Sequence, residues 1–302
     1  MILFLKNYTS SIVLFLIFFL LLGLLIIKFP KKYTEEQFVV NKTKYKNIWM
    51  YWENKPGKTK PVYLKLCFDT IFKNCDKNFT IHLLDEKTIY NYLPNLRKDL
   101  DEKLNIPQKA DYYRLKLLEK YGGIWLDSDT IVLKDLTPIV DRLEKYDFVG
   151  MGCIGRHNCK CGFPNPSNWV MASRPNTSFM KSCIEMANYL LDNNDRTYFQ
   201  IKYHSIGRKL LSSVIENYIE MGWKYYHYKS ACLERDSNGD KFTNNRLLDE
   251  GNIDQKCEEE YLLLPIYNTA PGFPPSFLEM SKKEILNSNM LISKFFRKAL
   301  DI

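Results

Sequence analysis

Two aspartates stand one residue apart where an apolar run of the sequence ends. Residues 120–133 read KYGGIWLDSDTIVL, so Asp127 and Asp129 directly follow the apolar tripeptide at 124–126. Two like charges this close repel one another, and a divalent cation bound by both removes the repulsion. Mg²⁺ and Mn²⁺ prefer oxygen ligands, usually one or two carboxylates together with substrate phosphates. The spacing therefore predicts a divalent-cation site, and a solvated acidic turn is the alternative.

A second pair of charged residues lies just upstream, on a predicted helix. Residues 106–121 read IPQKADYYRLKLLEKY, with helical spacing of apolar residues and Pro107 in the first turn. Asp111 and Arg114 are three residues apart, so they share one face of this helix and can contact the same ligand. An ordinary surface ion pair, which contributes little, is the alternative.

The elements around these residues predict an α/β domain with a mostly parallel sheet. The tetrapeptide GIWL at 123–126 predicts a strand, so Asp127 and Asp129 lie at its carboxyl end, where open α/β sheets bind ligands. Alternating patterns continue along the chain. We expect further strands at 48–51, 79–85, 147–152, 168–173, 224–228 and 261–267, and helices at 86–93, 176–191 and 205–219.

The stretch from Lys109 to Leu133 resembles a known family. Ala-Asp-x-x-Arg, then Tyr-Gly-Gly, then Ile-Trp-Leu-Asp-Ser-Asp is similar to the DXD-containing sugar transferases grouped with capsular polysaccharide synthesis proteins and initiating mannosyltransferases. Residues 48–56, IWMYWENKP, resemble the first strand of that group, and 203–211, YHSIGRKLL, resemble a later helix. Arg208 stands where the group often has proline. The resemblance is good over 47–136 and looser to 173.

This resemblance implies a GT-A type fold, a mixed sheet flanked by helices, and transfer of a sugar from a nucleotide-diphosphate donor with retention of the anomeric configuration. It implies Mn²⁺ or Mg²⁺ as cofactor, a UDP- or GDP-sugar donor, and a glycan or glycoprotein acceptor. Asp129 would ligate the metal directly, and Asp127 would act through a metal-bound water or the donor. The implied catalytic residues are Asp127, Asp129, Asp111 and Arg114, of which Asp129 and Asp127 also bind the metal. The implied donor-binding residues are Trp49, Trp52, Asp111, Arg114, Gly123, Trp125 and Asp127.

The N-terminus predicts a membrane anchor. Residues 7–27 contain no charge, and a helix of about 20 such apolar residues spans a bilayer core. We expect an uncleaved anchor at 1–30, a polar linker at 31–46 and the transferase domain at 47–302. A cleaved signal peptide is the alternative.

The side of the membrane stays open. Lys28, Lys31 and Lys32 follow the apolar run and favour a cytosolic domain. Eight cysteines and sequons at Asn41, Asn78 and Asn176 fit a lumenal, type II arrangement.

A basic C-terminal tail, residues 281–300, predicts a partly amphipathic helix. It either closes the domain or lies on a membrane surface. The net charge of +8 suits anionic partners such as a nucleoside diphosphate. Lys and Arg are spread along the chain and no nucleic-acid-binding motif is present in the sequence, so nucleic acid is not an expected partner.

Two other functions fit parts of the sequence. IWLDSDTIV also fits a haloacid dehalogenase-type phosphatase, in which Asp127 would be the nucleophile and Asp129 the acid and base, but a late acidic pair is missing. The second alternative function is a glycan-binding module that has lost catalytic turnover. His204, His227 or Asn268 could supply a third metal ligand, and the cysteine-rich stretch 153–163 matches no zinc pattern.

Overall fold

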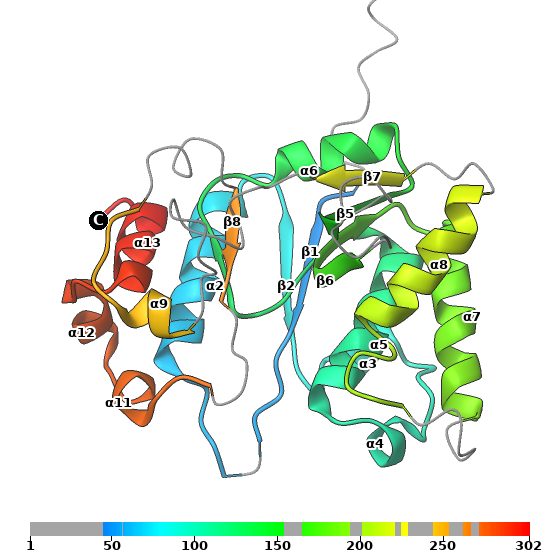
Figure 1. Ribbon diagram of the computed structural model, residues 1–302, viewed down its shortest axis with the longest axis horizontal. Helices are drawn as coiled ribbons and strands as arrows, with labels where there is room; N and C mark the ends of the chain where they lie inside the picture. Colours follow the sequence, from blue (N-terminus) through cyan, green and yellow to red (C-terminus); the bar gives the residue numbers. More distant parts are fainter. Residues whose placement is uncertain are drawn as a thin grey trace, which may run out of the picture. The chain divides into compact units, whose positions relative to one another are not determined.

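A mixed β-sheet forms the centre of the domain. The computed structural model describes residues 45–55, 57–153, 165–193, 201–220, 225–228, 244–253, 262–266 and 272–302. Within these ranges, six strands form one sheet in the order β2-β1-β3-β6-β5-β7 (Figure 1). Their bounds are β1 Asn47–Tyr51, β2 Thr80–Leu84, β3 Gly123–Leu126, β5 Phe148–Cys153, β6 Asn165–Ser173 and β7 Tyr225–Tyr228.

The sheet is parallel except at β6. β1 pairs in parallel with β2 and β3, and β5 pairs in parallel with β7. β6 runs antiparallel to both β3 and β5. A separate antiparallel pair joins β4 (Thr130–Val132) to β8 (Leu263–Pro265). The predicted α/β class and mixed sheet are confirmed.

Helices cover both faces of this sheet. In Figure 1, α2 and the helices α9 to α13 lie on one side, and α5, α7 and α8 lie on the other. The bounds are α2 Val62–Cys75, α3 Ile89–Tyr92, α4 Leu100–Lys103, α5 Ile106–Tyr121, α6 Thr137–Asp141, α7 Ser178–Asp192, α8 Arg208–Glu220, α9 Asn244–Leu248, α11 Pro275–Leu278, α12 Lys282–Asn287 and α13 Leu291–Leu300, with a 3-10 helix at Arg142–Glu144.

Strand alternation creates two hydrophobic cores. Ile48 and Met50 of β1 are buried in the core beneath α2 and α13. Trp49 and Tyr51, which alternate with them, are buried in the core beneath α5, α7 and α8. Successive side chains of a strand point to opposite faces, so a strand buried on both faces must be apolar throughout. The same alternation sends Trp125 of β3 toward α5.

Helix α5, which carries Asp111 and Arg114, has a defined start and end. Asn105 caps it: the Gln108 N–H donates to the Asn105 side chain and the Asn105 N–H donates to the Gln108 side chain, both at 3.1 Å. Such a capping box satisfies two otherwise unpaired donors. Gly122, with φ of 66°, ends the helix, and its N–H donates to Leu118 O at 3.0 Å. The predicted bounds of this helix are confirmed.

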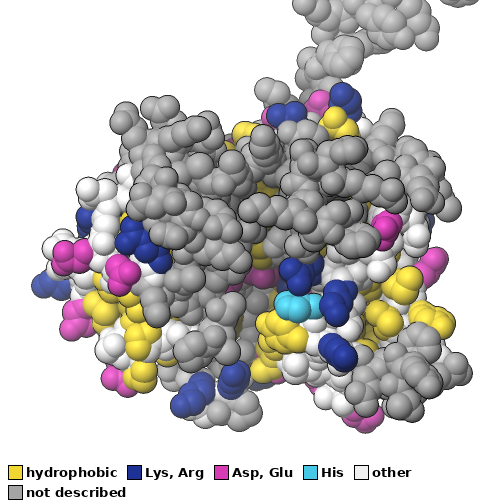
Figure 2. All heavy atoms as spheres, viewed as in Figure 1, with side chains coloured by type: hydrophobic (Ala, Val, Ile, Leu, Met, Phe, Trp, Pro, Cys, Tyr) yellow, Lys and Arg dark blue, Asp and Glu magenta, His cyan; other side chains and the backbone are white. Residues whose placement is uncertain are grey.

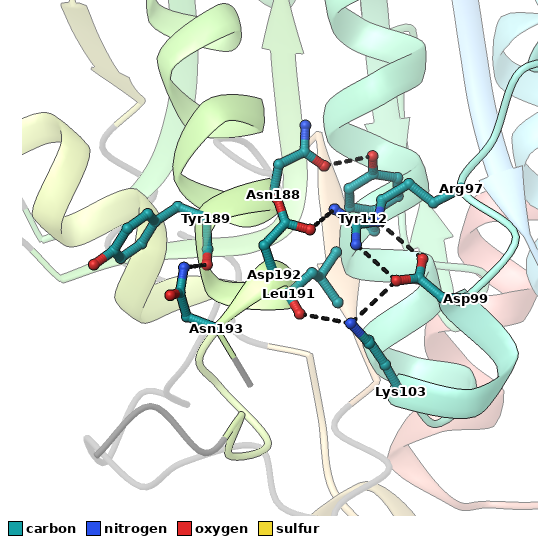
Figure 3. A network of polar contacts seen from close by, with 9 residues as sticks. All are labelled: Arg97, Asp99, Lys103, Tyr112, Asn188, Tyr189, Leu191, Asp192 and Asn193. Carbon is teal, nitrogen blue, oxygen red and sulfur yellow. Dashed lines mark hydrogen bonds and ion pairs between the residues drawn. The ribbon is translucent and has the colours of Figure 1, made fainter. Parts of the chain in front are cut away.

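A polar network fastens α5 and its preceding segment to α7 (Figure 3). Arg97 bridges Asp99 and Asp192, with nitrogen–oxygen distances of 2.7 Å to each carboxylate. The Tyr112 hydroxyl donates to Asn188 Oδ1 at 3.0 Å. Bidentate arginine contacts of this kind fix geometry as well as adding energy. The network therefore limits the movement of α5 relative to α7.

The C-terminal tail closes the domain. It forms two helices, α12 and α13, where the sequence predicted one. The apolar residues of both helices are buried against α2, namely Ile285, Leu291, Ile292, Phe295 and Phe296. The Asn74 side chain donates to Ala299 O at 3.0 Å and ties α13 to α2. Because this apolar face is already covered, the interpretation as a membrane-surface helix is wrong.

Several predictions fall outside the described residues. These are the anchor at 1–30, the linker up to residue 44, most of the cysteine-rich stretch, and Asn268. Among the described helices, none has the length and apolar character needed to cross a membrane.

Gly123 supplies a test of the packing at the start of β3. Its φ is 99°, and a Cβ there would lie 2.4 Å from Asn47 O. We expect Gly123→Ala to lower the free energy of unfolding by roughly 3 kcal/mol, because it adds a clash to backbone strain. Gly57→Ala is the control, since Gly57 also has positive φ, 70°, but no atom within 4 Å. Urea unfolding that gave equal losses for both would contradict the close contact.

Candidate active site

The turn that carries the two aspartates is held on three sides. The Asp127 N–H donates to Trp169 O of β6 at 2.8 Å, which extends the β3–β6 pairing. The Ser128 hydroxyl donates to Tyr51 O of β1 at 2.9 Å. The Ile266 N–H donates to Asp129 O at 2.8 Å, next to β8. The carboxylates therefore stand at a fixed place at the carboxyl end of β3.

Arg114 joins the helix to this turn. Its Nη2 lies 2.9 Å from Asp111 Oδ1 and 3.1 Å from Asp127 Oδ1. The Arg114 side chain is 5% exposed, that of Asp111 11% and that of Asp127 33%. The guanidinium also lies over the Trp125 ring, 4.9 Å from its centroid, and the Trp125 indole N–H donates to Asp127 Oδ1 at 2.9 Å. Arg114 thus contacts all three of the other sequence-predicted residues, Asp111, Trp125 and Asp127.

Two residues that the sequence analysis missed complete this cluster. The Asn168 Nδ2 donates to Asp111 Oδ1 at 2.7 Å, and the Asn168 carbonyl accepts a hydrogen bond from Arg114. A Cβ on Gly207 would lie 2.6 Å from both Asp111 Oδ2 and Asn168 Nδ2, so only glycine fits there. An asparagine in a strand and a glycine before a helix carry no chemical signal of their own.

The electrostatics of the cluster favour a bound cation. Burial raises the pKa of Asp111 to about 6, against the effect of Arg114. Burial and the neighbouring Asp127 charge raise the pKa of Asp129 to about 7. The pKa of Asp127 is also raised, mainly by burial. Within the described ranges, no Lys, Arg or His forms an ion pair with Asp129. The cluster thus holds more negative charge than Arg114 neutralises.

The residues present fit a hard divalent cation. Asp127 and Asp129 offer carboxylate oxygens, the ligand type that Mg²⁺ and Mn²⁺ prefer. No group of three or more His, Cys, Asp or Glu side chains in the described part of the chain could hold a metal on its own. These ions are usually bound by one or two protein carboxylates, and substrate phosphates and water complete the coordination shell. For His204, a suggested third ligand, burial and then the charged neighbours Arg208 and Lys209 lower the pKa.

Two residues of the implied donor site, Trp49 and Gly123, lie apart from the cluster. Trp49 is 1% exposed, stacks on His82 with ring centroids 4.1 Å apart, and donates to Gly122 O at 2.8 Å. Gly123 starts β3, about 13 Å along the strand from Asp127. The structure gives both a packing role, so neither is brought to the cluster. Trp52 follows β1 and is half-buried, with its indole N–H donating to Asn54 Oδ1 at 2.8 Å.

The raised pKa values predict how stability depends on pH in the cation-free protein. The folded chain retains protons on Asp111 and Asp129 that the unfolded chain releases at about pH 4. Stability should therefore fall as pH rises from about 4 to about 7. In Asp129→Asn, thermal unfolding in EDTA should show a smaller fall over the same range. An equal fall in both proteins would contradict the raised pKa of Asp129.

The chain is similar in sequence to a known protein. A curated relative is an uncharacterised glycosyltransferase of Acanthamoeba polyphaga mimivirus, 32% identical over 155 residues. The match covers 48% of this chain and 56% of the relative, so the chain spans little more than half of that protein's length.

Solved glycosyltransferases are also similar. A galactosyltransferase, LgtC, in complex with donor and acceptor sugar analogues, has a TM-score of 0.43 and 13% identity, covering 85% of this chain and 96% of that one. GlyE of Streptococcus pneumoniae has a TM-score of 0.43 and 13% identity, with 85% and 60% covered. The PaToxG glycosyltransferase has a TM-score of 0.38 and 16% identity, with 58% and 70% covered.

A family model also matches this sequence. The sequence model for capsular polysaccharide synthesis proteins matches residues 23–232, more than half of the 302 residues. The matched region includes Asp111, Arg114, Asp127 and Asp129. The chain therefore belongs to the capsular polysaccharide synthesis protein family.

Proposed function

We propose that this chain is a metal-dependent glycosyltransferase that moves a sugar from a nucleotide-diphosphate donor to a glycan or glycoprotein acceptor. The observation that carries the proposal is the contact of Arg114 with both Asp111 and Asp127 at the carboxyl end of β3, beside Asp129. Membership of the family and the glycosyltransferase relative support the same activity.

The buried part of the cluster is suited to holding the donor sugar. Asp111 and Asp127 accept hydrogen bonds, and Arg114 donates them, so together they match the hydroxyl groups of a pyranose. Asn168 donates to Asp111 Oδ1 and Gly207 packs against Asp111 Oδ2, so the position of the Asp111 carboxylate is fixed. Departure of a nucleoside diphosphate gives the sugar oxocarbenium character, so the chain must position the reacting atoms more than it must attack them.

Asp129 and Asp127 are the residues that would hold Mn²⁺ or Mg²⁺. Such a cation stabilises the negative charge that develops on the departing diphosphate. We assign Trp52, half-buried directly after β1, to the base of a UDP or GDP donor, as the family resemblance implies. Retention of anomeric configuration rests on the family resemblance alone. Anchoring in the bilayer through residues 1–30 stays a prediction.

The two alternatives are weaker. In a phosphatase, Asp127 would have to attack phosphorus, but it is held by Arg114 and by the Trp125 indole. A binding module without turnover has no observation in its favour, because the carboxylates and Arg114 are all present. A measurement of turnover therefore distinguishes the binding module from the proposed glycosyltransferase.

The decisive assay uses the purified full-length chain, Mn²⁺ and a panel of UDP- and GDP-sugars, with release of nucleoside diphosphate as the readout. We expect release from one donor, abolished by EDTA and restored by excess Mn²⁺. Asp129→Asn should reduce turnover on the order of 100- to 1,000-fold, because it removes a carboxylate from the cation site. Its thermal stability should not fall, since the replacement removes a charge that burial disfavours.

Asp69→Asn is the matched control. Asp69 lies on α2 and pairs with Lys282 at 2.7 Å, so its loss should leave turnover unchanged. If Asp129→Asn keeps full turnover, the cation assignment is wrong. If the folded wild-type chain binds a donor but releases no nucleoside diphosphate, either with water or with methyl pyranosides as the acceptor, the binding module replaces the transferase.

A further inference from the structure

A short turn before α8 packs directly against the cluster. Residues 201–207 enter α8, and Gly207 touches Asp111 so closely that a Cβ would lie 2.6 Å from its Oδ2. The Lys202 N–H donates to the Ser205 hydroxyl and the Ser205 N–H donates to Lys202 O, both at 2.9 Å. Ile206 is fully buried. The turn is therefore anchored at its centre and at both ends.

Helix α5 holds this turn from the other side. The Gln108 side chain, in the first turn of α5, donates to Lys202 O at 3.2 Å. The same helix carries Asp111 and Arg114 three and six residues further on. The turn and the cluster are thus supported by one element, and their relative position is fixed.

Tyr203 is the residue that this anchored turn presents to solvent. Tyr203 is 59% exposed, and it is one of the few large hydrophobic residues that are exposed in the described part of the chain. Its ring lies edge-on to His204, with centroids 4.8 Å apart. Most aromatic side chains in the described part of this domain are buried, so an aromatic ring held in the open beside charged groups needs an explanation.

The two neighbouring aromatic side chains of the turn face different surroundings. Burial, and then the carboxylates of Asp111, Asp127 and Asp129, raise the pKa of the Tyr203 hydroxyl. His204 instead has Arg208 and Lys209 as its charged neighbours. Figure 2 shows one face of the domain, on which Lys and Arg side chains lie next to hydrophobic ones. The Tyr203 hydroxyl therefore lies within electrostatic range of the three carboxylates, and the contact of Gly207 with Asp111 places the same turn against the cluster.

We propose that Tyr203 determines acceptor binding by packing its ring against a pyranose ring of the acceptor at the mouth of the site. This inference rests on the proposed function. The donor sugar takes the buried position at Asp111 and Arg114, so the solvent side is left for an acceptor that belongs to a larger glycan. An aromatic ring gives a large contact area at low entropic cost, and the C–H face of a pyranose complements it.

The test measures acceptor KM with methyl pyranosides as probes. The full-length chain is given its donor, Mn²⁺ and a panel of methyl α- and β-pyranosides, and acceptor-stimulated release of nucleoside diphosphate is followed. We expect Tyr203→Ala to raise the KM for the effective pyranoside about tenfold, with a much smaller change in donor KM. Tyr203→Phe should stay within about twofold of wild type, because the ring is retained.

Phe72→Ala is the matched control. Phe72 is also exposed, at 46%, but it lies near the end of α2. Helix α2 runs from the carboxyl end of β1 back toward the amino-terminal ends of the strands, away from the cluster. Its acceptor KM should equal that of wild type.

Three results would overturn the inference. An unchanged acceptor KM in Tyr203→Ala would remove the ring from the acceptor site, and an equal rise in donor KM would assign it to the donor. The inference would also be wrong if the wild-type chain turned over its donor but no pyranoside increased the release of nucleoside diphosphate. None of these results affects the transferase proposal, which is tested by metal-dependent donor turnover without acceptor.

Discussion

One buried cation, the guanidinium of Arg114, organises the polar groups at the carboxyl end of β3. It contacts Asp111 and Asp127 from two different elements and binds the backbone of a third at Asn168. Charges taken out of water are costly unless they are paired and fully hydrogen-bonded. The planar fork of arginine meets this requirement, and lysine would not. The helix, the strand end and β6 can therefore occupy only one relative position around it.

The rest of the fold supports this one contact. β3 is buried between β1 and β6, which places Asp127 beside Trp169 and Ser128 beside Tyr51. Gly122 ends α5 and allows the chain to turn directly into β3. Gly207 allows the turn before α8 to approach Asp111. The result is an acidic site with a rigid inner part and an open side on which Tyr203 lies.

Much of this site was predictable because its chemistry is local in sequence. Asp111 and Arg114 share a helix face, and Asp127 and Asp129 share a strand end, so spacing alone brings each pair together. Asn168 and Gly207 come from distant segments, and only tertiary packing brings them to Asp111. The family resemblance placed Trp49 near the donor, but alternation along β1 turns it into the core beneath α5. The amphipathic tail was ambiguous until α2 was found to cover its apolar face.

Binding of Mn²⁺ tests the central claim most directly, without depending on turnover. Electron paramagnetic resonance can count free Mn²⁺ in solutions of the full-length chain with UDP or GDP. The account predicts about one bound Mn²⁺ per wild-type chain, loss of that binding in Asp129→Asn, and no change in Asp69→Asn. Equal Mn²⁺ binding by the wild-type chain and Asp129→Asn would contradict it.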